Sequence, residues 1–456
     1  MNAEQRAREG KLPSQIRYII GNEAAERFSY YGMRSILVIF MTQYLLLEES
    51  QSKGVYHYFA FANYFVPIFG AWLADRFLGK YKTILYLSLF YCVGHGILAA
   101  FESKLGLYWG LAFIALGSGG IKPCVSALVG DQFDHTTQHL LKRVYSIFYF
   151  SINFGSFFST LLIPWTLKHY GPSIAFGIPG ILMAVATFIF WLGRKQYVVM
   201  PPTGKESGSQ FLPIIAYALN HQKKRAPGES FWAVAEKKFE KKKVEGVKAA
   251  LSIFSVFIAT TGFWALYDQH GASWVLQAEK MDRYFLGFQL EAAQIPALNP
   301  ILVMGLIPVF SFWIYPLIER LGVKVTPLRK MGAGMFLLAL AFFWVGALQA
   351  RLDAGDKVSV MWQFFPWVIL TAAEVMVSIT GLEFAYTQAP KEMKSTIMSF
   401  WLMTTALGNL LTAVISEMNR FKSGALEFYF YAFLMLAVAT VFAFMASRYQ
   451  EHDWVG

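Results

Sequence analysis

Long apolar runs separated by shorter polar segments form the main pattern of this 456-residue chain. A helix needs about 20 mostly apolar residues to cross the hydrocarbon core of a bilayer. Runs of that kind occur near residues 16–46, 55–75, 83–101, 107–129, 143–167, 173–193, 249–275, 299–319, 327–349, 360–388, 394–417 and 425–447. The pattern therefore predicts an all-α membrane protein with twelve transmembrane helices.

Lysine and arginine gather in alternate loops between these predicted spans. Basic residues follow the second span and precede the fifth, ninth and eleventh: Arg76, Lys80, Lys82, Lys142, Arg143, Lys324, Arg329, Lys330, Lys391 and Lys394. The intervening loops are acidic or balanced, as at Glu48 and Glu49. Because short loops rich in lysine and arginine stay in the cytoplasm, both chain termini are predicted to be cytoplasmic.

A polar insert at residues 194–248 separates the sixth predicted span from the seventh and carries most of the excess positive charge. Its lysine runs predict a basic amphipathic helix that lies on anionic cytoplasmic lipid. Nucleic-acid binding is disfavoured, because the run lacks a folded reader domain. The insert divides the chain into an N-terminal six-helix bundle (1–193), a cytoplasmic linker (194–248) and a C-terminal six-helix bundle (249–456). Two such bundles fit a transporter with a binding site near the middle of the membrane.

The composition supports the membrane assignment and argues against several classes of function. The chain is 56% hydrophobic and 15% charged, which is more apolar than a soluble protein of this length. Its two cysteines, Cys92 and Cys124, lie in apolar spans and predict neither disulfides nor a metal site. Residues 1–15 are polar, so we expect no removable signal peptide. The sequence shows no nucleotide-binding loop, paired metal ligands or nucleophile constellation, so we expect no enzyme activity and no cofactor.

The first predicted span carries a stripe of polar residues. Glu23, Glu26, Arg27, Tyr30 and Arg34 are spaced at i, i+3, i+4, i+7 and i+11, so on a helix they share one face. Arg34 lies about 16 Å along the helix from Glu23, too deep for a cytoplasmic turn to explain. Charges at that depth cost several kcal/mol unless they face partners or a water-filled cavity. The stripe therefore predicts a polar interior site.

Charged residues of other spans are predicted to meet this stripe. The direction and rise of each helix place Lys122 and Glu374 near mid-depth, and Asp268 toward the outside at a height similar to that of Arg34. Basic groups in one half and an acid in the other fit a ligand with both a carboxylate and an ammonium. An extended dipeptide or tripeptide is roughly 7 to 11 Å long and would suit such a cavity. Arg34 and Asp268 are expected to close the outside by pairing, and to separate when Asp268 is protonated or a ligand carboxylate competes.

Each of these residues also has a structural explanation. Arg34 or Lys122 would serve packing alone if it simply neutralised the acids of the first span. His57, near the outer end of the second span, is as consistent with a structural hydrogen bond as with proton transfer, although an unperturbed pKa near 6.5 suits histidine to proton handling. The aromatic residues of interest are core side chains by default: Tyr30, Tyr64 and Trp401.

Several longer motifs point to one family. They are E-x-x-E-R-F-x-Y-Y-G at 23–32, N-Y-F-V-P through A-D-R-F-L-G at 63–79, G-G-I-K-P at 119–123, G-D-Q-F at 130–133, F-Y-F-S-I-N at 148–153, F-W-A-L-Y-D-Q at 263–269 and G-L-E-F-A-Y-T-Q-A-P at 381–390. Together they resemble the signatures of the proton-dependent oligopeptide transporter (POT/PTR) family of the major facilitator superfamily, over nearly all spans. The resemblance implies twelve helices in two six-helix bundles. It also implies a symporter that imports di- and tripeptides with protons, by alternating access.

The resemblance implies a role for each polar residue. Proton coupling would involve His57, Asp268 and the charged group Glu23, Glu26, Arg27 and Lys122. The peptide carboxylate would be attracted by Arg34 and Lys122, and the amino end held by Glu374 and Asn299. The rest of the peptide would contact Tyr30, Tyr64, Asn153 and Trp401, with Trp401 shaping a side-chain pocket. His57 occupies the place where animal members carry a histidine linked to proton coupling.

Two departures from the family pattern are visible. Asp268 stands where many bacterial relatives have glutamate, and residues 194–248 are too polar for the two extra helices that many of those relatives insert.

The expected partners are peptides, protons as the coupling ion and membrane lipid, with no nucleic acid, and the protein is expected to act as a monomer in the inner membrane. Two alternatives stay open. One is transport of nitrate or an organic anion, which the glutamates disfavour, and the other is a channel or receptor.

Overall fold

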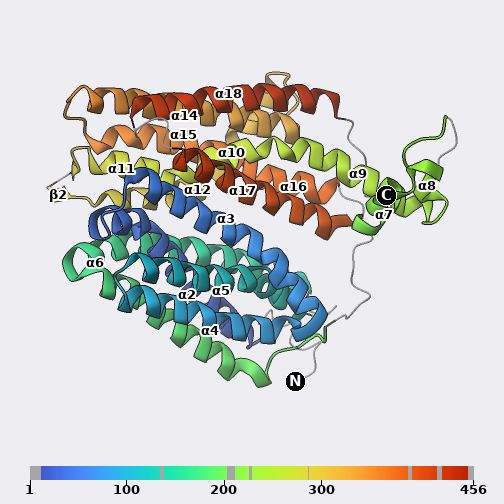
Figure 1. Cartoon of the computed structure of the whole chain (residues 1–456), viewed down its shortest axis with the longest axis horizontal. Coiled ribbons are helices and arrows are strands. Elements are labelled where there is room, and N and C mark those ends of the chain that lie inside the picture. The colour runs from blue at the N-terminus through green and yellow to red at the C-terminus, as the bar shows by residue number, and fades with distance from the viewer. Residues whose placement is uncertain are drawn as a thin grey trace.

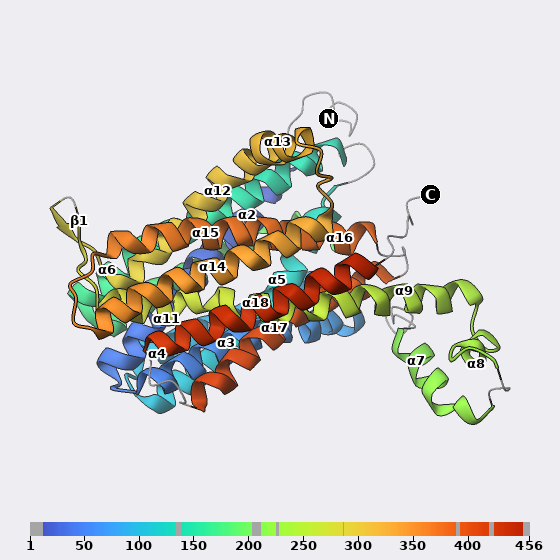
Figure 2. The ribbon, with the colours of Figure 1, turned by 90° about the horizontal axis from the view of Figure 1, so that it is seen from above.

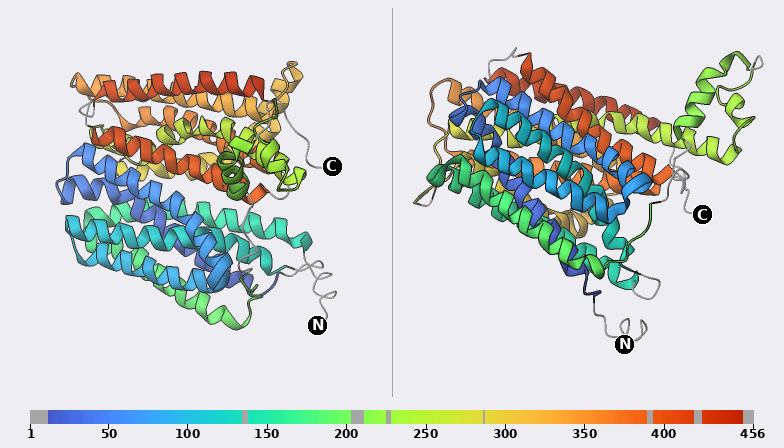
Figure 3. Two further views of the ribbon diagram at one scale, coloured as in Figure 1. Left: turned by 45° about the vertical axis from the view of Figure 1, so that its right-hand side comes forward. Right: turned by 60° about the horizontal axis from the view of Figure 1, so that its bottom comes forward.

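Helices make up nearly all of the computed structural model, which describes residues 12–133, 138–202, 211–224, 228–285, 287–388, 393–418 and 424–449. The strands β1 (Tyr284–Phe285) and β2 (Phe288–Gln289) pair in an antiparallel hairpin. Figure 1 shows two stacked groups of long helices, the first coloured blue to green and the second yellow to red. The left view of Figure 3 shows the same two groups from another direction.

The N-terminal helix group is built from the first part of the chain. It comprises α2 (Ile16–Ile39) with the π-helix η1 (Phe40–Tyr44), α3 (Glu49–Leu73) with the π-helix η2 (Ala74–Leu78), α4 (Gly79–Ala100), α5 (Lys104–Asp131), η3 (Gln138–Leu140), and α6 (Leu141–Leu192) with η4 (Gly193–Lys195). Within this group α6 packs on α2 and α4, while α5 packs on α3 and α4.

The C-terminal helix group follows the linker. It comprises α9 (Lys241–Ile258), α10 (Thr260–Tyr267), η7 (Asp268–Gly271), α11 (Ser273–Glu279), η8 (Ala292–Ala297), α12 (Leu298–Val309), η9 (Phe310–Ile314), α13 (Tyr315–Arg320), α14 (Pro327–Asp353), η10 (Val360–Gln363), α15 (Phe364–Glu374), η11 (Val375–Ile379), α16 (Thr380–Thr387), α17 (Lys394–Glu417) and α18 (Ala425–Arg448). Here α14 packs on α15 and α18, and α10 packs on α17. The two groups meet chiefly where α17 packs against α3.

Twelve spans can be traced through the described residues. Eight helical stretches are long and apolar enough to cross a membrane, or nine if the pair from α9 to α11, bent by 41°, counts as one. Two of these stretches, Glu49–Ala100 and Arg143–Lys195, each contain two spans. The chain reverses inside them at Gly79 (φ 73°) and Gly171 (φ 80°), a backbone conformation that favours glycine. The first helix, α2 with η1, is the remaining span, and its charged residues make it less apolar. The predicted twelve-helix membrane fold is confirmed.

The outward-facing side chains explain why this fold needs lipid. Phe312 and Trp313 are each 76% exposed, and the span that contains them, Ala292–Arg320, is only 11% buried. Large apolar surfaces of this kind are unfavourable in water and mark contact with a membrane or a partner. Because helices satisfy their own backbone hydrogen bonds, such spans are stable in hydrocarbon. The chain is thus a multi-pass membrane protein.

The linker contains short helices that lie beyond one end of the two groups. They are α7 (Phe211–Asn220), η6 (Gln222–Lys224) and α8 (Ala233–Glu236). Figure 2 shows α7 and α8 at the end opposite the β-hairpin, and we call these the linker end and the hairpin end. The ring of Phe211 lies 5.1 Å from that of Phe400, which fixes α7 to α17. The predicted lipid contact of the linker and the domain limits 1–193, 194–248 and 249–456 stay predictions, and Lys391 lies outside the described residues.

Candidate functional site

A cavity of about 310 Å³ lies between the two helix groups. Its volume is at the lower end of the range for small-molecule sites. The N-terminal group contributes Tyr31, Arg34, Tyr64, Tyr149 and Asn153 to its wall, and the C-terminal group contributes Trp264, Tyr267, Asp268, His270, Asn299 and Glu374. The wall is therefore aromatic, with a small number of charged and amide groups from both groups of helices.

Two irregular helical segments shape the C-terminal side of this cavity. The α-helix α10 ends at Tyr267 and passes into the 3₁₀ turn η7, and α15 ends at Glu374 and passes into the π-helix η11. Such breaks recur at functional sites, because they redirect side chains and free backbone groups to line a cavity. They bring Asp268 and His270 from η7 and Val375 from η11 onto the same wall.

Arg34 and Asp268 form an ion pair between the two groups. Arg34 Nη2 lies 2.6 Å from Asp268 Oδ1, and both side chains are almost fully buried. The other carboxylate oxygen, Oδ2, accepts a hydrogen bond of 2.6 Å from Asn409 Nδ2. Asn409 Oδ1 then accepts from Nδ1 of His57 at 2.9 Å, an assignment that follows because the amide nitrogen is already donating. A continuous polar chain therefore joins α2, η7, α17 and α3.

Glu374 carries the acidic group on the cavity wall contributed by α15. Its Oε2 accepts a hydrogen bond of 2.6 Å from Asn299 Nδ2. The same amide nitrogen lies 3.4 Å from the hydroxyls of Tyr267 and Thr371. This network holds a carboxylate and a carbonyl oxygen at one part of the cavity, and the Arg34 guanidinium stands at another. The cavity can therefore hold both ends of a dipolar ligand.

The charged group of the first span lies within the N-terminal helix group and not on the cavity wall. Arg27 Nε contacts Glu23 at 2.7 Å and Glu26 at 3.0 Å, and Ser118 Oγ donates to Glu26 at 3.1 Å. Lys122 makes no ion pair with another described residue. Its Nζ lies 4.3 Å from the ring centroid of Tyr30, so its charge rests on an aromatic face.

The structure separates the predicted site residues into two sets. Those on the cavity wall are Arg34, Tyr64, Asn153, Asp268, Asn299 and Glu374. Those away from it are Glu23, Glu26, Arg27, Tyr30, His57, Lys122 and Trp401. Lys122 also lies 5.5 Å from the ring of Tyr64, a wall residue, so one aromatic layer separates its ammonium from the cavity.

Trp401 differs most from the prediction, because it packs behind the wall. Its ring lies 6.0 Å from Trp264 and 4.9 Å from Phe257. A Cβ atom at Gly381 would overlap the Trp401 ring, so glycine at that position lets the indole sit against α16. Trp264, which lines the cavity, lies between Trp401 and the cavity.

Several wall residues were missed at the level of sequence. Trp264 and Tyr267 precede Asp268 by four residues and one residue, and Trp264 shares a helical face with both, so the spacing could have indicated it. His270 gave no comparable signal. It reaches the wall only because the helix changes to a 3₁₀ turn at Asp268.

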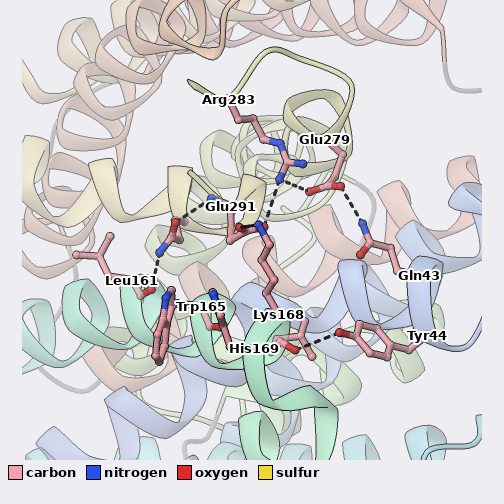
Figure 4. A network of polar contacts seen from close by, with 11 residues as sticks. Gln43, Tyr44, Leu161, Trp165, Lys168, His169, Glu279, Arg283 and Glu291 are labelled. Atoms are coloured by element: carbon pink, nitrogen blue, oxygen red, sulfur yellow. Dashed lines mark hydrogen bonds and ion pairs between the residues drawn. The ribbon is translucent and has the colours of Figure 1, made fainter. Parts of the chain in front are cut away.

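Further contacts join the two groups at the hairpin end, as Figure 4 shows. Lys168 Nζ lies 2.5 Å from Glu291 Oε1, and Arg283 bridges Glu291 at 3.4 Å and Glu279 at 3.0 Å. Gln43 Nε2 donates to Glu279 at 2.8 Å. This network connects α6 and η1 with the segment from α11 to η8.

A buried ion pair adds to this closure. Lys53 Nζ lies 2.7 Å from Glu427 Oε2, and the side chains are only 4% and 7% exposed. Near them the Tyr58 hydroxyl donates to Glu417 at 2.9 Å. These contacts, together with the Arg34–Asp268 and His57–Asn409 pairs, join the two groups between the cavity and the hairpin end. The structure is thus a conformation sealed at that end.

Comparison with known proteins places the chain in a family. The family model described as PTR2, POT family, matches residues 81–427. The chain belongs to the POT family. This finding confirms the predicted family and the major facilitator type of fold.

Named relatives agree with this assignment. Solute carrier family 15 member 2 of Homo sapiens is 39% identical over 393 residues, which cover 81% of this chain and 54% of that protein. Peptide transporter family 1 of Drosophila melanogaster is 29% identical over 655 residues, covering 97% of this chain and 88% of that protein. The chain therefore spans about half the length of the human relative.

Solved structures show the same fold. A crystal structure of the POT family transporter PepTSo is 43% identical and matches with a TM-score of 0.90, covering 97% of this chain and 99% of that chain. A structure described as an auto inhibited POT family peptide transporter matches with a TM-score of 0.90 at 40% identity, covering 97% and 98%. Membership in a transporter family confirms the expectation that the protein is not an enzyme.

Proposed function

We propose that this protein is a symporter that imports di- and tripeptides together with protons, by alternating access. One observation carries the proposal: a single cavity between the helix groups holds a guanidinium from one group and a carboxylate from the other. A peptide with free termini carries the complementary charges. Relatives that are themselves named peptide transporters support this choice of ligand.

The wall chemistry supports one orientation of the peptide. Its carboxylate would lie toward Arg34, with Lys122 contributing long-range attraction through the Tyr64 ring. Its ammonium would bind Glu374 and the carbonyl oxygen of Asn299, which is free to accept because the amide nitrogen is donating. The peptide body would contact Tyr64 and Asn153, with Tyr30 behind them, and Trp401 would support the side-chain pocket through Trp264.

The orientation in the membrane is also a proposal. The linker end, with the basic insert, would face the cytoplasm together with both termini, and the hairpin end would face the outside of the inner membrane. The structure would then represent a state closed to the outside. The bundles 1–193 and 249–456 would rock about the cavity, joined by residues 194–248, and a monomer would suffice because the cavity lies within one chain.

Protons would act on the ion pairs that hold this state. Protonation of Asp268 removes the charge that retains Arg34, and a peptide carboxylate competes for the same guanidinium. His57 lies two hydrogen bonds away through Asn409 and can take part. Glu23, Glu26, Arg27 and Lys122 bring two negative and two positive charges together, so a proton added to either acid would leave a net positive charge. One charge crossing 100 mV supplies about 2.3 kcal/mol, enough for a concentration ratio of tens.

Uptake into proteoliposomes under an imposed pH gradient tests the function. Wild-type protein is expected to accumulate a labelled dipeptide, and an uncoupler is expected to abolish accumulation. Glu23→Gln and Glu374→Gln are expected to lose it, and Glu240→Gln, which changes a linker side chain that is 71% exposed, is expected to keep it. Nitrate uptake without dipeptide uptake would replace the proposal by anion transport. Dipeptide flux that never exceeds equilibrium would indicate a channel.

A further inference from the structure

His270 occupies an unusual position in the cavity. It lies in η7, two residues after Asp268, and lines the main cavity. It also lines an adjoining pocket of about 50 Å³, whose wall includes Arg34 and Tyr56. The imidazole therefore lines both the main cavity and the small pocket, next to the Arg34–Asp268 ion pair.

The hydrogen bonding of His270 identifies which ring nitrogen is free. Nδ1 lies 2.7 Å from the backbone carbonyl oxygen of Tyr267. A carbonyl oxygen only accepts, so Nδ1 carries the hydrogen of this bond. The ring packs edge-on against Tyr267 at 4.8 Å and Trp367 at 5.2 Å, which holds its orientation. Nε2 has no hydrogen-bond partner among the described residues, so it is the atom available to a ligand in the cavity.

The charges around Nε2 explain why a second basic group would strengthen the binding of a ligand carboxylate. Arg34 is already paired with Asp268, whose other oxygen is bonded to Asn409. A ligand carboxylate therefore meets a guanidinium that is already neutralised. The basic side chains on the described cavity wall are Arg34 and His270. Of these two side chains, only His270 can add a positive charge to the cavity without separating Arg34 from Asp268.

The groups that face His270 set when this charge appears. Arg34 from α2 and Asp268 within η7 line the same cavity, and His57 from α3 is linked to Asp268 through Asn409. Tyr31 and Tyr56 also line the adjoining pocket. Glu374 from α15 lines the same cavity. A bound carboxylate would add a negative charge beside the imidazole, which favours its protonated form.

We propose that His270 binds the carboxylate of the incoming peptide through Nε2 and takes up a proton as it does so. The lone pair of Nε2 accepts a proton from solvent, and the resulting N–H donates to the carboxylate while Nδ1–H keeps its bond to Tyr267. One proton is thereby bound together with each ligand, and this first contact of the carboxylate does not require the Arg34–Asp268 pair to open; competition for Arg34 follows it. This inference rests on the proposed function, because it requires a ligand with a carboxylate.

Calorimetry on the purified protein in lipid nanodiscs tests the proposal without transport. The dissociation constant of dialanine is measured at pH 5.5 and 7.5 for wild type, His270→Gln and His221→Gln. His221 is a matched control, because its Nδ1 also lies against a backbone carbonyl, that of Tyr217, at 3.0 Å, but in the linker. A charge-assisted hydrogen bond is worth about tenfold or more in affinity. His270→Gln is therefore expected to weaken binding about tenfold at pH 5.5 and little at pH 7.5, and His221→Gln is expected to match wild type.

Two further measurements make the outcome decisive. Titration in buffers of different ionisation enthalpy counts the protons bound with the ligand, and His270→Gln is expected to bind fewer than wild type. His270→Lys places a permanent cation there and is expected to bind tightly at both pH values. Melting temperatures show which of the two His270 variants is folded, and the conclusion is drawn from the folded one. Unchanged pH dependence and proton uptake in His270→Gln, or unchanged pH dependence in His270→Lys, would overturn the proposal. If wild type binds no dialanine at either pH, the proposed function fails with it.

Discussion

Replacement of Asp268 by asparagine should open the hairpin end of the protein. The Asp268 side chain is 2% exposed and that of Arg34 is 10% exposed, so solvent screens the pair little. Removing one partner of a buried pair costs about 3–5 kcal/mol, because the other charge is left uncompensated. In the sealed conformation Asp268→Asn leaves Arg34 in that state, whereas in an open conformation water would reach it. A difference of about 3 kcal/mol corresponds to a change of roughly a hundredfold in the ratio of sealed to open molecules.

Distance measurements between spin labels test this shift. Leu46 and Tyr284 lie near the hairpin end, on different helix groups, and are 80% and 64% exposed, so labels there disturb little packing. In the Asp268→Asn protein we expect a second population with a longer distance. Asp356→Asn is a suitable control, because Asp356 pairs with Arg351 at the surface, where the two side chains are 49% and 59% exposed. An exposed pair of this kind contributes about 0–1 kcal/mol, so the control should show the wild-type distribution.

If Asp268→Asn shows the same distances as wild type while Arg34 stays buried, the pair does not hold the two groups together. The remaining contacts, such as the buried pair of Lys53 and Glu427, would then carry the closure alone.

Three other predictions concern stability and binding. Lys53→Met alone should lower the melting temperature, because it leaves the buried Glu427 carboxylate without its partner at a cost of about 3–5 kcal/mol. The double variant Lys53→Met with Glu427→Leu should recover most of that loss. Gly408→Ala should destabilise the protein by about 1–3 kcal/mol, since its Cβ would come within 2.6 Å of a carbonyl oxygen on α10; unchanged thermal unfolding would contradict this. Glu374→Gln should weaken dipeptide binding in calorimetry by tenfold or more, as expected for loss of a charge-assisted contact. Equal binding would exclude Glu374 as the partner of the ammonium.

The sequence by itself determined the number of spans and the existence of a buried polar site. Hydropathy is a local property, so runs of apolar residues indicate membrane helices without knowledge of their partners. The spacing from Glu23 to Arg34 likewise specifies one helical face, because helical periodicity is local. Helix ends were less predictable. The helix α9, which begins the seventh span, starts at Lys241, eight residues before the predicted start at 249. Polar helical residues outside the membrane leave no hydropathy signal.

Only the tertiary structure decided which side chains reach the cavity. Arg34 and Asp268 are 234 residues apart in sequence, and their pairing depends on how two groups of helices pack. Lys122 and Trp401 occupy spans that border the site, yet Tyr64 and Trp264 stand between them and the cavity. His270 faces the cavity because α10 changes to a 3₁₀ turn after Tyr267. Contacts between distant segments and local breaks in helical geometry are set by packing, and so the polar pattern of the chain could indicate a site but not its walls.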